Sequence, residues 1–342
     1  MNHGGNMVGI EDVAAAAGVS TATVSRAIRG LPRVSPRTRA KILATAKELG
    51  YVPSSAASRL ASGKTHTIGV LAPYVDRWFF GKAIAGVDRE LHGRGYNLSL
   101  FNLGGRTQPR ERLFSKAMVQ KQIDALLLLC MYLHQEEIED LHAIDMPLVV
   151  VGGPVPGLSN VGIDDYQAAR TITEHLIELG HRHIALLHGQ DDSDLNFSVP
   201  RIRVEGFHDA VHQAGLEFDP DTALFGNFTV ESGVEAMRRF LELPAPRPTA
   251  IVCASDEMAL GVMFEARRHG IRIPEELSVV GIDGHEMAAA VGLTTVWQDP
   301  TAQARRGTQM LLAELGGDEG AVHPENAEQR LIVRESTAPP RH

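Results

Sequence analysis

Two spacings of apolar residues divide the chain. Up to about residue 50, apolar side chains recur three or four positions apart in three short stretches, which predicts three short helices. From residue 66 onward, apolar runs such as residues 67–72 and 125–130 alternate with longer stretches of helical spacing. Strands that alternate with helices form parallel sheets covered by helices. The pattern therefore predicts an all-α head followed by an α/β body.

The head has the local signals of a helix-turn-helix module. Val13 and Ala17 lie on one face of a first helix, and Gly18 allows the tight turn that follows. Ser20 is placed to cap a second helix, because its hydroxyl can accept from the free amides of the first turn. The outer face of this second helix presents Thr21, Ala22, Ser25, Arg26 and Arg29. Short polar residues followed by arginines are typical of a helix that reads the major groove of DNA.

Charge is distributed unevenly between the two parts. Residues 1–66 contain nine Lys or Arg and three acidic residues, which gives this segment a net charge of +6. The whole chain has a net charge of −9, so the remaining residues carry −15. A small basic head on a large acidic body indicates a polyanionic partner for the head alone. The alternative is a solvated helix surface that happens to be basic.

One long stretch of the head also resembles a known family. The strings DVAAAAGVSTATVSRAIRG, VSPRTRAKI and AKELGYVPSSAASRLASGKTHTIGVLAP follow one another between positions 12 and 73. This stretch resembles the amino terminus of the LacI/GalR repressor family in both spacing and residue type. The remainder of the chain resembles that family more loosely. The resemblance implies a transcription regulator with a DNA-binding helix-turn-helix head.

The resemblance implies roles for residues of the second helix. Thr21 and Ala22 stand where the family varies its base-reading pair, and Arg26 stands where a side chain reaches a base edge. Ala22 can contact a thymine methyl group but cannot make a bidentate hydrogen bond. Arg29 replaces an asparagine that is common in the family. The residues expected at phosphates or at the helix cap are Ser20, Thr23 and Ser25, with a plain surface serine as the alternative for Ser25.

The predicted domains are a helix-turn-helix head (residues 1–52), a hinge (residues 53–65) and an effector-binding and dimerisation domain (residues 66–342). The hinge contains helix-forming residues but is too short for a stable isolated helix. In the LacI/GalR family the corresponding segment folds on DNA, and Leu60 stands where a leucine enters the minor groove and kinks the duplex. Ala57 is small enough for two such helices to pack across a dyad. The alternative for Leu60 is a contact that anchors the linker to the body.

Two successive strand–helix series in the body predict two parallel-sheet lobes, and this pattern resembles the type I periplasmic-binding-protein fold. Ligands of open α/β sheets bind at the carboxyl ends of the strands, so two facing lobes would share a cleft. The chain is expected to cross between the lobes near residues 162–165, 290–294 and 322–327. The lobes would then comprise residues 66–163 with 293–323, and residues 164–292 with 324–338.

The chemistry expected in this cleft suits a polyhydroxylated ligand. Carboxylates and guanidinium groups bind pairs of hydroxyls, and aromatic rings cover the apolar faces of a sugar. The candidate effector-binding residues are Phe79, Phe80, Asp164, Arg201, Arg203, Phe228, Ser255 and Asp283. The family resemblance implies a ligand role most directly for Asp283 and Arg203. Gly152 stands where some relatives have a polar residue.

Several of these residues have simpler alternatives. Asp164 can cap the helix that follows it, and Arg201 can be solvated. Phe79 and Phe80 can belong to the core. Asp256, which follows the candidate Ser255, is expected to cap the helix that it begins.

No metal ion or cofactor is expected. His181 and His183 project from the same side of an extended segment, but a metal needs further ligands that converge on the same point. Cys130 and Cys253 lie in or at the end of strand-like runs, which favours buried, reduced thiols over a disulfide. No apolar run is long enough to span a membrane, and the start of the chain lacks a signal-peptide pattern. Together these features predict a cytoplasmic location.

The function predicted from the sequence is allosteric control of transcription, most often repression. A homodimer would place two heads on a palindromic double-stranded DNA operator, and a sugar or sugar derivative in the cleft would alter the DNA affinity. The tail STAPPRH has no apolar heptad, so a dimer is expected rather than a tail-mediated tetramer. A purine or nucleoside is the alternative effector.

Two other classes of function are disfavoured. A small-molecule-binding protein without a regulatory role would have no use for the basic head. An enzyme is not expected, because the body contains no GxGxxG, P-loop or GxSxG motif.

Overall fold

The structure is a computed structural model that describes residues 8–51, 64–104, 122–131, 134–143, 146–153, 157–189, 199–317 and 323–341. The chain divides into two compact units, Met1–Thr65 and His66–His342. Across the described part of the chain, no helix combines the length and the apolar character needed to cross a bilayer.

The head consists of α1 (Ile10–Ala17), α2 (Thr21–Ile28) and α3 (Pro36–Glu48). The three helices pack around a small core because each contributes apolar side chains from one face. The core residues are Val13, Ala14, Ala17, Val24, Ala27, Ile42 and Ala46.

The turns between the head helices follow from single residues. Gly18 ends α1 in the left-handed region with φ of 68°, which a residue without a Cβ adopts at little cost. Ser20 Oγ then accepts a hydrogen bond from the Thr23 amide at 3.2 Å and so caps α2. Ser35 Oγ accepts from the Thr38 amide at 3.1 Å and caps α3 in the same way. Gly18 and Ser20 thus form the turn between α1 and α2 that the sequence predicted for a helix-turn-helix module.

The first lobe of the body is built on a six-stranded sheet in the order β11-β5-β4-β3-β1-β2, in which every neighbouring pair is parallel. Its strands are β1 (Thr67–Ala72), β2 (Asn97–Asn102), β3 (Ala125–Leu129), β4 (Leu148–Val151), β5 (Ser159–Gly162) and β11 (Pro324–Asn326). Its helices are α5 (Trp78–Leu91), α7 (Gln135–Ala143) and α13 (Pro300–Leu315).

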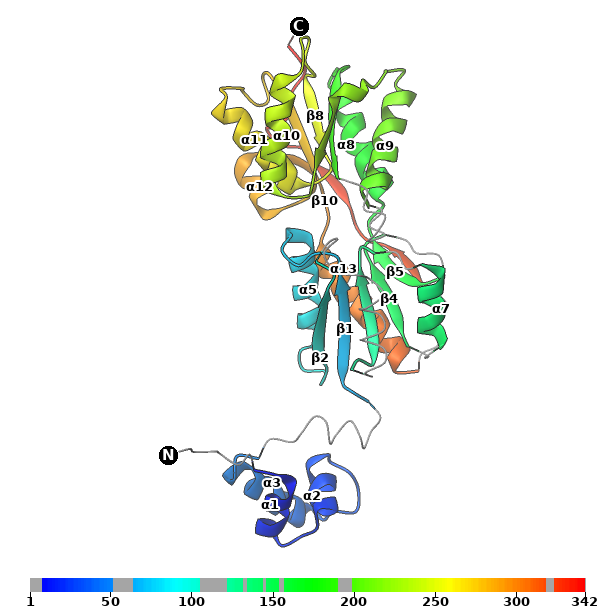
Figure 1. Cartoon of the computed structure of the whole chain (residues 1–342), viewed down its shortest axis with the longest axis vertical. Helices are drawn as coiled ribbons and strands as arrows, with labels where there is room; N and C mark the ends of the chain where they lie inside the picture. Colours follow the sequence, from blue (N-terminus) through cyan, green and yellow to red (C-terminus); the bar gives the residue numbers. More distant parts are fainter. Residues whose placement is uncertain are drawn as a thin grey trace. The chain divides into compact units, whose positions relative to one another are not determined.

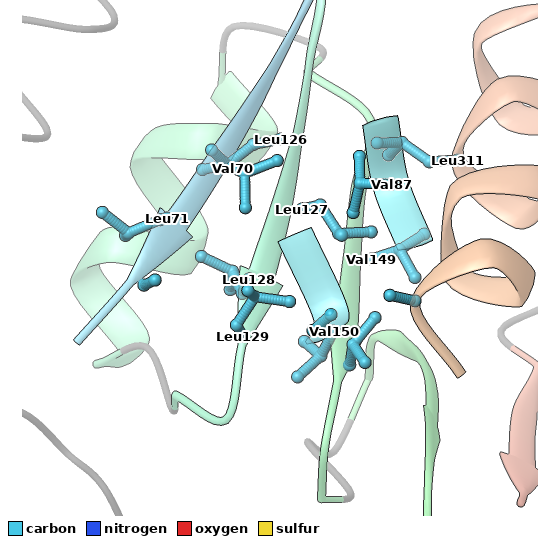
Figure 2. Close-up of a cluster of buried hydrophobic side chains, with 14 of the residues drawn as sticks. Val70, Leu71, Val87, Leu126, Leu127, Leu128, Leu129, Val149, Val150 and Leu311 are labelled. Carbon is cyan, nitrogen blue, oxygen red and sulfur yellow. The ribbon is translucent and has the colours of Figure 1, made fainter. Parts of the chain in front are cut away.

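The core of this lobe lies between the sheet and the pair α5 and α13, which pack against each other. Every residue of β3 and of β4 is buried, so both faces of these central strands are covered, one of them by α13. Figure 2 shows Leu127 of β3 and Val149 of β4 close to Val87 of α5 and Leu311 of α13. The continuous apolar runs that predicted buried strands are thus explained by the two covered faces.

The second lobe has a six-stranded sheet in the order β12-β10-β9-β8-β6-β7, parallel except for the β10–β12 pair. Its strands are β6 (Ile184–Gly189), β7 (Ala223–Gly226), β8 (Ala250–Cys253), β9 (Ser278–Asp283), β10 (Thr294–Trp297) and β12 (Arg330–Ile332). Its helices are α8 (Asp165–Glu178), α9 (Val199–Gln213), α10 (Val230–Glu242), α11 (Asp256–Arg268) and α12 (Glu286–Val291). In Figure 1, α8 and α9 lie on one side of β8, and α10 and α11 lie on the other.

The predicted boundaries of the lobes need two corrections. The crossing expected near residues 290–294 is wrong, because β10 pairs in parallel with β9 and so completes the second sheet. The chain crosses only after Trp297, at residues 298–299, before α13 packs on the first sheet. The strand β11 pairs with β5 of the first sheet, so the last crossing lies at residues 327–329. The fold class itself, a helical head with two parallel-sheet lobes, is confirmed.

Candidate functional site

Residues from both lobes of the body line one cavity with about 540 Å³ of empty space, part of it open to solvent. The first lobe contributes Arg77, Phe79, Phe80, Cys130, Gly152 and Gln303, and Ile163 lies in the crossing that follows β5. The second lobe contributes Asp165, Val199, Arg203, Phe228, Ser255, Glu257, Asp283 and, at its exit, Gln298. Several of these residues end or follow a strand, so the cavity lies where parallel sheets bind ligands.

The wall of the cavity contains a buried positive charge, the guanidinium of Arg203 on α9. Its Nε donates to Asp165 Oδ1 at 2.8 Å, and one terminal nitrogen lies 2.7 Å from the same oxygen. That nitrogen also lies 3.8 Å from Asp283 Oδ1. The other terminal nitrogen donates to the carbonyl oxygen of Ala254. These partners fix the position of the guanidinium before any ligand binds.

Burial dominates the protonation of the carboxyl groups around Arg203. It raises the pKa of Asp283 to about 6, although Arg203 and the Gln298 amide oppose the shift. It also raises the pKa of Asp165, which Arg203 again opposes. For Arg203, burial alone would lower the pKa, but the carboxylates of Asp165 and Asp283 outweigh it and raise the pKa. Arg203 is therefore charged, and its guanidinium interacts with both Asp165 and Asp283.

The carboxyl group of Asp256 lies close enough to Asp283 to interact with it electrostatically. Asp256 is fully buried and accepts from Thr295 Oγ1 at 2.7 Å and from the His285 amide at 2.8 Å. Burial and the Asp283 carboxylate raise its pKa to about 7, against the effect of those hydrogen bonds. The prediction that Asp256 caps α11 is wrong, because Ser255 is the cap and accepts from the Met258 amide at 3.3 Å.

Three aromatic rings form the apolar part of the wall. Phe79 and Phe80 pack edge to face with ring centroids 5.5 Å apart, and Phe80 is buried. Phe228 follows β7 with φ of 55°, in the left-handed region. Its ring lies against Gly189, where a Cβ would approach the ring to 1.9 Å. Glycine at this position is what allows the ring to stand in the wall.

Contacts between the lobes lie at the start of α5. The Arg77 guanidinium donates to Asn227 Oδ1 at 3.0 Å, and the Trp78 amide donates to Glu257 Oε2 at 3.2 Å. The Trp78 indole donates to Glu286, whose carboxylate also lies 3.1 Å from Lys82 Nζ. Burial raises the pKa of Glu257 to about 7. These polar contacts hold the two lobes together along one edge of the cavity.

Six of the eight predicted effector residues meet at the cavity: Phe79, Phe80, Arg203, Phe228, Ser255 and Asp283. The other two do not. Asp164 is exposed and caps α8 by accepting from the Gln167 amide at 2.9 Å. Arg201 is exposed and pairs with Glu205 at 2.5 Å, because two residues along a helix turn it about 200° away from Arg203.

The sequence reasoning missed Arg77, Asp165, Glu257, Gln298 and Gln303. Asp165 had a readable signal, since it lies three, four and seven positions before the apolar residues that form the buried face of α8. A carboxylate on such a face needs a buried partner. Gln298 and Gln303 carry no comparable signal, because the sequence pattern predicts the second crossing between the lobes near residues 290–294, before both of them.

Histidine and cysteine do not form a metal site in the described residues. The His181 ring is buried and lies 2.8 Å from Thr249 Oγ1 and 2.9 Å from the carbonyl oxygen of Ala338, which fixes the end of the chain on the second lobe. Cys130 and Cys253 are both buried and unpaired with each other.

The head presents a separate candidate surface on α2. Its exposed residues are Ser20, Thr21, Ala22, Arg26 and Arg29, while Thr23 and Ser25 are half-buried. Arg29 Nε donates to the carbonyl oxygen of Ser25 at 3.3 Å. Ala57 and Leu60 lie outside the described residues. The exposed face of α2 is thus short and polar at its start and basic towards its end, as a base-reading helix requires.

Comparison with known protein families gives two matches on this chain. Residues 9–54 match the model of bacterial regulatory proteins of the lacI family. Residues 173–337 match the model of a periplasmic binding protein-like domain. The HTH-type transcriptional repressor PurR of Vibrio atlanticus (strain LGP32) is 34% identical over 337 residues, which cover 95% of this chain and 99% of the relative.

Two solved structures of similar proteins extend the comparison. The complex of the transcriptional regulator CelR with cellobiose shares 32% identity and a TM-score of 0.70, and the match covers 96% of this chain and 99% of that one. The lac repressor dimer bound to operator and the anti-inducer ONPF shares 25% identity and a TM-score of 0.84, over 97% and 100% of the two chains. All three relatives are named as regulators of transcription, not as enzymes.

Proposed function

Because the chain belongs to the LacI family of bacterial regulatory proteins, we propose that it is a repressor whose affinity for operator DNA is set by a small molecule in the cavity of the body. The observation that carries this proposal is the lining of one cavity by residues of both lobes. A ligand that touches both lobes binds best at one angle between them, and only such a difference in affinity can shift a conformational equilibrium.

The DNA-binding part of the proposal rests on α2. Thr21 and Ala22 would face the bases, Arg26 would reach a base edge, and Arg29 would lie nearer the phosphates. The net charge of +6 over residues 1–66 supplies the attraction to the phosphate backbone that does not depend on sequence.

A homodimer on a palindromic operator is the assembly that we propose. Two heads related by a dyad would read two half-sites, and Leu60 of each protomer would enter the minor groove between them, where Ala57 lets the two hinge segments pack closely. A change in the angle between the lobes would then alter the separation of the hinge segments.

We propose a neutral sugar or sugar derivative as the effector. The cavity combines three phenylalanine rings with an arginine and several carboxyl groups, which suits a ligand with apolar faces and many hydroxyls. The similarity to the CelR–cellobiose complex supports the same class. A purine or nucleoside, which the same rings could stack on, is the alternative.

The DNA part is tested by selection of duplexes from a random pool with the purified full chain. We expect an inverted repeat to be enriched, and we expect Arg26→Ala to reduce the preference for it over a scrambled duplex by roughly 5- to 150-fold. Arg37→Ala is the matched control, because it removes the same charge from an exposed position on α3. Equal loss of preference in both variants, or no enriched sequence, would refute the assignment.

The effector part is tested by a thermal-shift screen of the same protein against sugars, purines and nucleosides. We expect at least one sugar to raise the melting temperature and to change the affinity for the selected duplex. A shift with nucleosides alone would replace the sugar by the alternative effector. The proposed dimer requires twice the chain mass in light scattering, and a monomer on the selected duplex would exclude it.

A further inference from the structure

Gln303 is an unexpected polar residue in the first lobe. It lies on the face of α13 that packs into that lobe, next to Ala304 and Gly307, and it is only 3% exposed. Its side chain forms part of the wall of the cavity. Within the described residues, its carbonyl oxygen Oε1 is buried and meets no hydrogen-bond donor. Buried acceptors in native proteins nearly always have a partner, so this atom requires an explanation.

The orientation of Gln303 follows from a chain of hydrogen bonds that begins at Asp283. Gln298 Nε2 donates to Asp283 Oδ1 at 2.9 Å, and Gln303 Nε2 donates to Gln298 Oε1 at 3.0 Å. An ionised carboxylate can only accept, so Gln298 must turn its amino group towards Asp283 and its oxygen towards Gln303. Gln303 must then donate through its Nε2, so its Oε1 is the last atom of this series of hydrogen bonds and has no donor.

The chain of bonds also spans the two lobes. Asp283 ends β9 of the second lobe, Gln298 lies in the crossing between the lobes, and Gln303 belongs to α13 of the first lobe. The backbone amide of Gln298 donates to the backbone carbonyl oxygen of Asp283 at 3.2 Å, so the main chain also fixes the position of Gln298. The acceptor at the free end is therefore held in place by both lobes.

We propose that Gln303 is a specificity-determining residue for the effector, and that its Oε1 accepts a hydrogen bond from a hydroxyl or N–H group of the bound molecule. This inference rests on the proposed function and adds a requirement to it: the effector carries a donor on the side that faces α13. A site with a buried acceptor rejects analogues that lack the donor, because the acceptor then stays without a partner.

The test uses the purified full chain, the variant Gln303→Met and the control Gln309→Met. Methionine has nearly the length and volume of glutamine and no acceptor, and Gln309 is a half-buried residue of the same helix that does not line the cavity. Melting temperatures are measured without ligand and with cellobiose, D-glucose, D-ribose and adenosine. For the probe that binds most tightly, titration calorimetry is repeated with its single-deoxy analogues.

We expect Gln303→Met to leave the melting temperature of the ligand-free protein close to the wild-type value, because the removal of an acceptor without a partner is offset by the loss of the hydrogen bond that Gln298 Oε1 accepts. It should also weaken binding of the probe by roughly threefold to tenfold, a typical loss for one neutral hydrogen bond. One deoxy analogue should bind the wild type less tightly than the parent probe but bind Gln303→Met as well as the parent does. Gln309→Met should show neither effect.

Two results would overturn the inference. If every deoxy analogue loses as much affinity for Gln303→Met as for the wild type, no hydroxyl of the probe meets Oε1. Unchanged affinity of Gln303→Met for a probe that binds the wild type would show that no donor meets Oε1. If no probe binds the wild type, the proposed effector classes fail, whereas a probe that binds the wild type and Gln303→Met equally overturns this inference alone.

Discussion

The buried pair of Arg203 and Asp165 gives the sharpest test of the electrostatics in the cavity wall. Both residues are 6% exposed, and Nε and a terminal nitrogen of the arginine lie within 2.8 Å of one carboxylate oxygen. The variant Arg203→Met keeps the apolar stem and removes the charge. Asp165 and Asp283 are then left without their shared cation.

The expected loss is large because buried carboxylates without a partner are costly. Removal of one member of a buried ion pair typically destabilises a protein by about 3–5 kcal/mol, whereas replacement of both members is often close to neutral. We therefore expect Arg203→Met to lose about 3–5 kcal/mol near pH 8. The double variant Arg203→Met/Asp165→Leu should recover a substantial part of this loss.

The pH dependence gives the sign of the effect. Arg203 lowers the pKa of both acids, and even so burial holds that of Asp283 at about 6 in the folded protein. Without the arginine, both folded-state pKa values rise further above their unfolded values. A carboxyl group with a raised pKa stabilises the fold at low pH, and this contribution is lost as the pH rises through the folded value. The destabilisation by Arg203→Met should therefore be small near pH 5 and complete near pH 8.

Urea unfolding followed by tryptophan fluorescence measures these free energies in the body, since the only two tryptophans are Trp78 in α5 and Trp297 in β10. Arg201→Met is the matched control on the same helix. Its side chain is 55% exposed, and its one ion pair among the described residues is with Glu205, so we expect less than about 0.5 kcal/mol. The reasoning is refuted if Arg203→Met costs less than about 1 kcal/mol at pH 8, or if its cost is the same at pH 5.

Three further predictions concern other parts of the molecule. Burial raises the pKa of Asp256 from 3.8 to about 7, so its contribution to stability is lost between about pH 4 and pH 7; Asp256→Asn should flatten the fall of the melting temperature over this range, and an unchanged slope would contradict the shift. Ser20→Ala should destabilise the head by about 1 kcal/mol through loss of the α2 cap, which faster hydrogen exchange of the α2 amides would reveal; equal exchange rates would mean that the cap contributes little. Gly189→Ala should displace the Phe228 ring and cost about 1–3 kcal/mol; a crystal structure with the ring unmoved would disprove this.

Local sequence was sufficient to predict the three helices of the head and the fold class of the body. Helix ends in the head depend on residues next to one another, such as Gly18 before Ser20, and these act through contacts within one turn. Buried parallel strands can be recognised in the sequence as apolar runs, because both of their faces are covered. Six of the eight predicted cavity residues likewise followed from their places at strand ends or on the adjoining helices.

Only the tertiary structure decided the features that depend on contacts between distant segments, namely the sheet that β10 joins and the residues that face the cavity. The sequence does not show whether β10 joins the second sheet or the first, because the same apolar strand can pair with either edge. The choice between Asp164 and Asp165, and between Arg201 and Arg203, depends on helix rotation, which one residue changes by about 100°. The position of Gln298 depends on which sheet β10 joins, and the position of Gln303 depends in addition on the rotation of α13. The series of hydrogen-bonded amides that ends at Gln303 could therefore be recognised only in three dimensions.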